Sequence, residues 1–172
     1  MSATQRLASK VTIVTGASSG IGAETARQFA NAAAAVVMVC DVNEKLGHQV
    51  VEEIRASGGN AEFRRLDVVD EDEWTAVLSE VTAQYGRLDA LANIAGVSGR
   101  DPGDPVENPD GSVGTKITEQ SLAGWQRIME INSTGTFLGT KHAAGAMAAS
   151  GGGSIINISS ICGLIGSYSS AP

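Results

Sequence analysis

The stretch TGASSGIG, residues 15–22, constrains the fold more than any other part of the sequence. It follows a short apolar run at residues 11–14 and precedes apolar residues at helical spacing, which predicts a tight turn from a strand into a helix. Glycines permit the positive φ angles and the close backbone approach that such a turn needs. The free N–H groups and the positive dipole end of the helix favour an anion there. Glycines also occur in such turns for conformational reasons alone, so the turn by itself does not establish a phosphate site.

Strand and helix patterns alternate along the rest of the chain. Apolar runs that indicate further buried strands lie at residues 36–40, 88–92 and 154–159. Asp70 and Glu73 form a capping-box-like pair at the start of the clearest helical pattern. We count five strands and at least four helices, all in one domain over residues 1–172. This α/β alternation predicts a Rossmann-type, doubly wound parallel sheet with helices on both faces, whose ligands bind where the strand order reverses.

Composition narrows the possible partners. The 172 residues are 42% hydrophobic and carry a formal net charge of −7 without a basic cluster, which disfavours nucleic acid and anionic membrane surfaces. No apolar run approaches the roughly 18 residues of a membrane span, and the start MSATQRLASK lacks the apolar core of a secretory signal. Cys40 and Cys162 have neither disulfide nor metal-ligand spacing, so no metal site is expected. These features favour a cytoplasmic protein with a small-molecule partner.

Asp41 lies 19 residues after Gly22, at the end of the second predicted strand. A carboxylate at this position can accept hydrogen bonds from both ribose hydroxyls of NAD and repels the 2′-phosphate of NADP. No Arg or Lys between Asp41 and Lys45 offsets that repulsion. We therefore expect NAD as the cofactor. The alternative is that Asp41 caps the following helix, but Asn43 is the better cap candidate.

The segment VSGRDPGDPVENPDGSVGTK, residues 97–116, has no periodicity and is rich in proline, glycine and acidic residues. This composition predicts a long loop. Because the segment follows the strand at residues 88–92, we expect a loop insertion near the substrate side that helps to cover the pocket.

Five motifs occur in a familiar order, namely TGASSGIG, RLDV at 65–68, NIAG at 93–96, INSTGTF at 131–137 and IINISS at 155–160. With these motifs, the chain resembles the short-chain dehydrogenase/reductase family over nearly its whole length. The resemblance implies a Rossmann fold, a nicotinamide cofactor and hydride transfer between a secondary alcohol and a ketone. It also implies a homo-oligomer, either a tetramer or a dimer.

The resemblance further assigns residues to the cofactor. Those that shape the diphosphate site would be Gly16, Ser18, Gly20, Ile21 and Gly22. Asp41 would hold the ribose, and Asp67 with Val68 would border the adenine. Asn93 and Gly96 would lie beside the cofactor and brace the fourth strand.

Two residues match catalytic positions of the family. Asn132 would hold a helix kink and a water of the proton relay, although its local sequence also fits a simple helix-interrupting asparagine near Gly135. Ser160 would hydrogen-bond the substrate oxygen. Its neighbour Ser159 would point into the structure, because adjacent strand residues face opposite ways.

Two positions depart from the family pattern. Ile94 stands where the family has a second asparagine, a change we interpret as tolerated. The segment NAAAAVV at residues 31–37 lacks the usual glycine between the first helix and the second strand. Asn31 is expected to take the left-handed conformation in its place.

The family's proton donor is a Tyr followed four residues later by a Lys on the same helix face. Tyr168 has Pro172 in the place of that Lys and lies only eight residues after Ser160, so we do not assign it as the donor. We expect the Tyr–Lys pair beyond Pro172, together with the C-terminal strands and helices that complete this dinucleotide-binding domain, and we expect residues 1–172 alone to be inactive as a reductase. Two alternatives stay open: a non-catalytic dinucleotide-binding protein, and a same-fold lyase or dehalogenase. The identity of the substrate and the direction of the reaction are not encoded in these residues.

Overall fold

The computed structural model describes residues 5–98, 118, 121–160 and 163–164. Most of the predicted loop at 97–116 lies outside the described residues, as do Cys162 and Tyr168.

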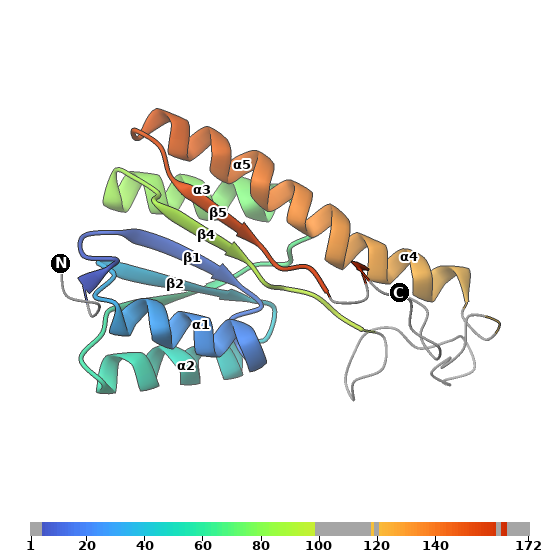
Figure 1. Ribbon diagram of the computed structural model, residues 1–172, viewed down its shortest axis with the longest axis horizontal. Coiled ribbons are helices and arrows are strands. Elements are labelled where there is room, and N and C mark those ends of the chain that lie inside the picture. Colours follow the sequence, from blue (N-terminus) through green and yellow to red (C-terminus); the bar gives the residue numbers. More distant parts are fainter. Residues whose placement is uncertain (1–4, 99–117, 119–120, 161–162, 165–172) are drawn as a thin grey trace.

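Five parallel strands form one sheet in the order β3-β2-β1-β4-β5 (Figure 1). The strands are β1 (Val11–Thr15), β2 (Val36–Asp41), β3 (Ala61–Arg65), β4 (Ala90–Asn93) and β5 (Ser154–Asn157). The chain runs outward from β1 to β3 and then returns to the other side of β1 to form β4. The order therefore reverses between β1 and β4, which confirms the predicted Rossmann-type sheet. In sheets of this type, ligands bind at the carboxyl ends of the strands beside the reversal, and we call this side of the sheet the ligand edge.

Helices cover both faces of the sheet (Figure 1). They are α1 (Gly20–Asn31), α2 (Glu44–Ala56), α3 (Glu71–Tyr85), α4 (Leu122–Met129), the π-helical turn η3 (Glu130–Thr134) and α5 (Gly135–Ala149). Alternate residues of each central strand pack toward opposite layers. Ile13 and Leu91 join the core under α3 and α5, while Val14 and Ala92 join the core under α1 and α2. Of the helices in the described part of the chain, none is long and apolar enough to cross a membrane.

Both predicted helix caps form. The Asn43 side chain accepts a hydrogen bond from the Leu46 N–H at the start of α2. The Asp70 carboxylate accepts from the N–H groups of Asp72 and Glu73 at the start of α3. The Glu73 carboxylate accepts from the Asp67 N–H rather than from Asp70, so only half of the capping box is present.

The left-handed residue after α1 is Ala33, with a φ of +65°, and the prediction of Asn31 was wrong. Asn31 is the last residue of α1. The Ala34 N–H donates to the Phe29 carbonyl and the Ala33 N–H donates to the Ala30 carbonyl. These are the two bonds of a Schellman ending, in which the left-handed residue lies two positions after the last helical residue.

Candidate functional site

The glycine-rich turn lies at the carboxyl end of β1, beside the point where the strand order reverses. Gly16 has a φ of +63°, and a Cβ there would lie 2.8 Å from the Cα of Ala95. A Cβ on Gly22 would lie 2.1 Å from the carbonyl oxygen of Gly16. These two glycines are therefore required by the packing of the turn against itself and against the segment after β4.

Gly20 differs from those two glycines. Its φ is +50°, yet a Cβ there would meet no atom within 4 Å. A side chain at Gly20 would thus project into open space at the start of α1. The N-cap residue Ser19 makes no side-chain cap hydrogen bond, and the first turn of α1 holds no acidic residue. Such a helix start is suited to an anionic ligand.

The Asp41 carboxylate lies against this turn. One oxygen accepts a hydrogen bond from the Ser18 N–H at 3.0 Å, and the other accepts from the Asn43 N–H at 2.9 Å. Since Asn43 caps α2, the alternative role of Asp41 as that cap is wrong. A carboxylate oxygen can accept more than one hydrogen bond, so Asp41 keeps capacity for a ribose hydroxyl.

Thr15 is a site residue that the sequence analysis did not single out. Its hydroxyl oxygen accepts from the N–H groups of both Ile94 and Ala95, at 3.0 and 3.1 Å, and the residue is 1% exposed. The buried hydroxyl thus fastens the segment after β4 to the end of β1, where the strand order reverses. The position of Thr15 inside the glycine-rich motif was the one indication in the sequence that it belongs to the site. Its partners could not be predicted, because they lie about 80 residues away in sequence.

The residues expected near the adenine lie in the segment between β3 and α3. One Asp67 carboxylate oxygen accepts from the Val69 N–H at 3.2 Å. Val68 is 8% exposed, and its carbonyl accepts from the indole N–H of Trp74 at 2.9 Å. A Cβ on Gly135 would lie 2.7 Å from a Val68 methyl carbon, which allows α5 to approach this segment closely. The adenine contacts of Asp67 and Val68 stay predictions.

Asn132 lies in η3, where the helix widens into a π-turn, so the expected irregularity of this helix is present. Its amide nitrogen donates to the Val97 carbonyl at 2.9 Å, and its amide oxygen accepts from the Val97 N–H at 2.8 Å. A Cβ on Gly96 would lie 3.3 Å from the same amide oxygen. The Asn132 side chain therefore holds the chain that leaves β4 against the helix. Its role toward a relay water stays a prediction.

Asn93 is 5% exposed, and its amide nitrogen donates to the Asn157 side chain of β5. Ser159 and Ser160 follow the end of β5 and are both exposed. The Ser160 carbonyl accepts from the Gly163 N–H at 2.9 Å. The predicted strand at 154–159 ends at Asn157 instead, because its partner β4 ends at Asn93. Which serine faces a substrate stays a prediction.

The pKa values of Cys40 and Asp89 are strongly perturbed, although neither side chain is assigned to the ligand site. Burial raises the pKa of the Cys40 thiol to about 12, which makes this thiol unreactive at neutral pH. Asp89, at the opposite end of the strands, has a side chain only 4% exposed. Burial alone would raise the pKa of Asp89, but hydrogen bonds from Arg87, the Val11 N–H and Lys10 lower it to about 2. Asp89 therefore ties together the beginnings of β1 and β4 and has a structural role.

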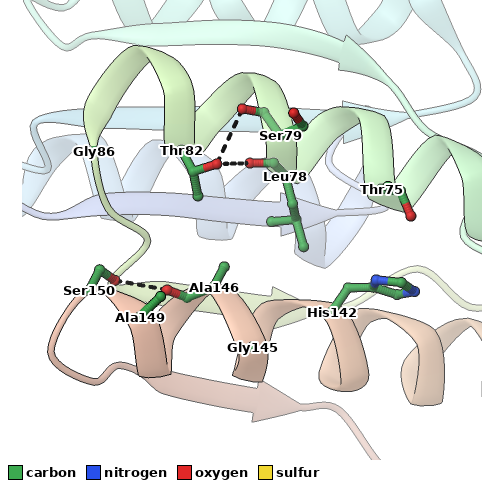
Figure 2. Close-up of a pocket in the computed structure, with 10 residues that line it drawn as sticks. All are labelled: Thr75, Leu78, Ser79, Thr82, Gly86, His142, Gly145, Ala146, Ala149 and Ser150. Atoms are coloured by element: carbon green, nitrogen blue, oxygen red, sulfur yellow. Dashed lines mark hydrogen bonds between the residues drawn. The ribbon is translucent and has the colours of Figure 1, made fainter.

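A groove of about 410 Å³ lies between α3 and α5 (Figure 2). Thr75, Ser79 and Thr82 line one wall, and His142 and Ser150 line the other. The Thr82 and Ser150 hydroxyls donate to carbonyls of their own helices. None of the lining residues comes from the glycine-rich turn or from a strand end, so the groove is separate from the ligand edge. Within the described ranges, no three His, Cys, Asp or Glu side chains gather where they could hold a metal ion.

The order of the parallel strands reverses between β1 and β4, a glycine-rich turn follows β1, and an acidic residue ends β2. These features define the Rossmann-type class of proteins. The family model described as short chain dehydrogenase matches residues 10–172. The chain therefore belongs to the short-chain dehydrogenase family.

Relatives agree with this assignment. The 2,5-dichloro-2,5-cyclohexadiene-1,4-diol dehydrogenase of Sphingobium indicum is 42% identical over 159 residues, which cover 92% of this chain and 58% of that protein. Cyclopentanol dehydrogenase of Comamonas is 39% identical over 166 residues, which cover 96% of this chain and 60% of that protein. The chain thus spans less than two thirds of the length of these relatives.

Among solved structures, a 7α-hydroxysteroid dehydrogenase in complex with NADH and 7-oxoglycochenodeoxycholic acid superposes with a TM-score of 0.81 at 32% identity. The match covers 97% of this chain and 59% of that one.

Proposed function

We propose that this chain forms the cofactor-binding part of an NAD-dependent oxidoreductase that interconverts a secondary alcohol and a ketone. The observation that carries the proposal is the Asp41 carboxylate, held by the Ser18 N–H beside a glycine-rich turn at the ligand edge. The named relatives support the reaction class, since their names describe dehydrogenases of a cyclic diol and of cyclopentanol. The similar hydroxysteroid dehydrogenase was solved as a complex with NADH, which supports a nicotinamide cofactor.

The residues present fit that cofactor. The start of α1 lacks a side-chain cap, and the space beside Gly20 is open, which suits a diphosphate. The residues that would hold it are Gly16, Ser18, Gly20, Ile21 and Gly22, with Asp41 at the ribose. The side chain of Ile21 is 67% exposed at this turn, so it is available for contact with a bound dinucleotide.

When bound, the nicotinamide supplies the hydride donor or acceptor. The chain's own residues would place the substrate and support proton movement. Ser160 would donate a hydrogen bond to the substrate oxygen, and Asn132 would hold a relay water near η3. Within residues 1–172 we assign no proton donor, because Tyr168 is followed by Pro172 where a lysine is needed.

The preference for NAD is tested with Asp41→Asn in the protein expressed from its natural reading frame. Asparagine keeps an acceptor for the Ser18 N–H but removes the charge that would repel the 2′-phosphate. We expect the ratio of kcat/KM for NAD to that for NADP to fall by about tenfold or more. Asp72→Asn is the matched control, since it removes the same charge from the exposed first turn of α3.

An unchanged cofactor ratio in Asp41→Asn would contradict the assignment of Asp41. Tight NAD binding without turnover on any secondary alcohol or ketone would favour the non-catalytic alternative. Family resemblance also supports a homo-oligomer, either a tetramer or a dimer. Light scattering of the purified protein tests the oligomeric state.

A further inference from the structure

β5 is a short, largely exposed strand that is held at its start, where the Ser154 N–H donates to the Asp89 carbonyl and Ile155 packs against the core under α3 and α5. It has four residues, of which only Ile155 is not exposed, and it follows the glycines at 151–153. In the described part of the chain it pairs with β4 alone. The register of β5 decides the direction of the side chains that follow it, because a slip of one residue turns every side chain to the opposite face. Because Ser159 and Ser160 follow directly, such a slip would exchange the two serines.

A pair of asparagines marks the correct register. Asn93 and Asn157 are directly opposite each other in the β4–β5 pairing. The Asn93 amide nitrogen donates to the Asn157 amide oxygen at 2.9 Å. The Ile158 N–H donates to the Asn93 carbonyl at 3.2 Å, so the side-chain bond lies beside the final backbone bond between the two strands.

Helix α5 holds the donor of this pair in place. A Cβ on Gly139 would lie 2.4 Å from the Asn93 amide oxygen, so the amide is packed directly against the helix backbone. The Asn93 amide nitrogen also lies 3.4 Å from the Thr140 hydroxyl oxygen. Asn93 thus presents a buried donor toward β5 in a fixed direction.

The neighbours of Asn157 cannot replace it. Ile156 and Ile158 flank it, and neither side chain has an acceptor. A slip of one residue in either direction would therefore remove the shortest hydrogen bond of the Asn93 amide nitrogen. Only the longer ones to the Thr136 carbonyl at 3.5 Å and the Thr140 hydroxyl at 3.4 Å would stay, which is unfavourable for a buried donor. Of the observed register and the two that differ from it by one residue, only the observed one allows the hydrogen bond between Asn93 and Asn157.

We propose that Asn157 is a positioning residue which, through its hydrogen bond from Asn93, fixes the register of β5 so that Ser160 rather than Ser159 faces the substrate. This inference rests on the proposed role of Ser160, and it gives a role to Asn157, which lies in the same IINISS motif.

The test compares Asn157→Asp with Asn157→Leu in the protein expressed from its natural reading frame. Aspartate keeps an oxygen that accepts from Asn93, while leucine has a similar size and no acceptor. We expect Asn157→Leu to lower kcat by about tenfold or more with the NAD Kd changed less than about twofold, because the serine moves and the cofactor site does not. Asn157→Asp should keep kcat within about threefold of the wild type. Ile156→Val, on the same strand and the opposite face, is the control and should change neither value.

Hydrogen exchange gives a readout that does not depend on activity. The Ile158 amide, which donates to the Asn93 carbonyl, should exchange faster in Asn157→Leu than in Asn157→Asp. Equal kcat in Asn157→Leu and the wild type, or equal losses in the two variants, would overturn the proposal. If Asn157→Leu does not fold, Asn157→Ala takes its place in the same comparison.

Different results would refute the proposed function and the role of Asn157. A wild-type protein that binds no NAD, or turns over no alcohol or ketone, refutes the proposed function. In that case the exchange of the Ile158 amide still decides whether Asn157 fixes the register: faster exchange with leucine alone supports this, and equal exchange in both variants overturns it.

Discussion

Replacing Asp89 with Asn should destabilise the protein in a pH-dependent way. The Asp89 carboxylate accepts hydrogen bonds from the Val11 N–H at 2.9 Å, from Lys10 Nζ at 3.0 Å and from Arg87 Nε at 2.8 Å. Its side chain is 4% exposed, whereas those of Lys10 and Arg87 are 44% and 43% exposed. After the substitution, water can still solvate the charges of Lys10 and Arg87. The side chain at position 89 would, however, accept the hydrogen bond from the Val11 N–H, at the start of β1, more weakly.

The magnitude follows from the pKa. The pKa of Asp89 falls from its ordinary 3.8 to about 2 on folding. At 1.36 kcal/mol for each pKa unit, this difference corresponds to about 2 kcal/mol of stability at neutral pH. Because the folded-state pKa is depressed, this stability is fully present above about pH 4 and is lost as the pH falls from about 4 toward 2.

Urea unfolding of the wild type and Asp89→Asn at a series of pH values measures this contribution. We expect a loss of about 2 kcal/mol at pH 7, and a smaller difference between the two proteins as the pH falls below about 4. Glu53→Gln is the matched control, because Glu53 pairs with Arg27 at a largely exposed site and should change stability by less than about 0.5 kcal/mol. A difference that is the same at pH 7 and pH 3, or a loss no larger than that of the control, would refute the reasoning.

Two further predictions concern the scaffold. Ala33→Gly should stabilise the protein by about 1 kcal/mol in thermal or urea unfolding, because Ala33 has a φ of +65° that glycine adopts without strain. Ala32→Gly is the control and should not stabilise the protein, because the φ of Ala32 is −82°. If both glycines lower stability, Ala33 is not strained. Cys40 should resist alkylation at pH 8 in the folded protein and react after unfolding, since burial raises its pKa to about 12. Rapid labelling of Cys40 under native conditions would show that β2 opens.

The central strands were predictable because strands buried on both faces consist mainly of apolar residues. β1 is buried at every residue and β2 at every residue except Asp41, so both are mostly apolar, with Thr12 and Thr15 as the polar residues of β1. β3 was counted from the alternation of elements but not located by an apolar run. Its sequence AEFRR is only partly buried, because β3 lies at the edge of the described sheet.

Element ends were less predictable, since they depend on distant partners. β5 stops pairing where β4 ends, and nothing in IINISS marks that point. The left-handed residue after α1 was misplaced because the Schellman hydrogen bonds, rather than the usual preference of asparagine, decide its position.

The glycine-rich turn and Asp41 were predictable from residue type and spacing. The roles of Thr15 and Asn157 were not, because their partners become visible only when the strand pairing is known. Thr15 contacts residues just after β4, and Asn157 contacts Asn93 only in one register. A hydroxyl or an amide in a strand pattern carries no local signal of such a partner.

The central claim is that NAD binds at the glycine-rich turn, and calorimetric titration of NAD into the wild type, Gly20→Val and Gly58→Val tests it most directly. Gly20 and Gly58 have φ angles of +50° and +86°, and a Cβ at either would meet no protein atom within 4 Å. The two valines should therefore strain the backbone similarly, while only the valine at Gly20 meets the bound diphosphate. We expect Gly20→Val to raise the NAD Kd by about 100-fold or more, and Gly58→Val to change it less than about twofold. An NAD Kd for Gly20→Val equal to that of the wild type would contradict the account.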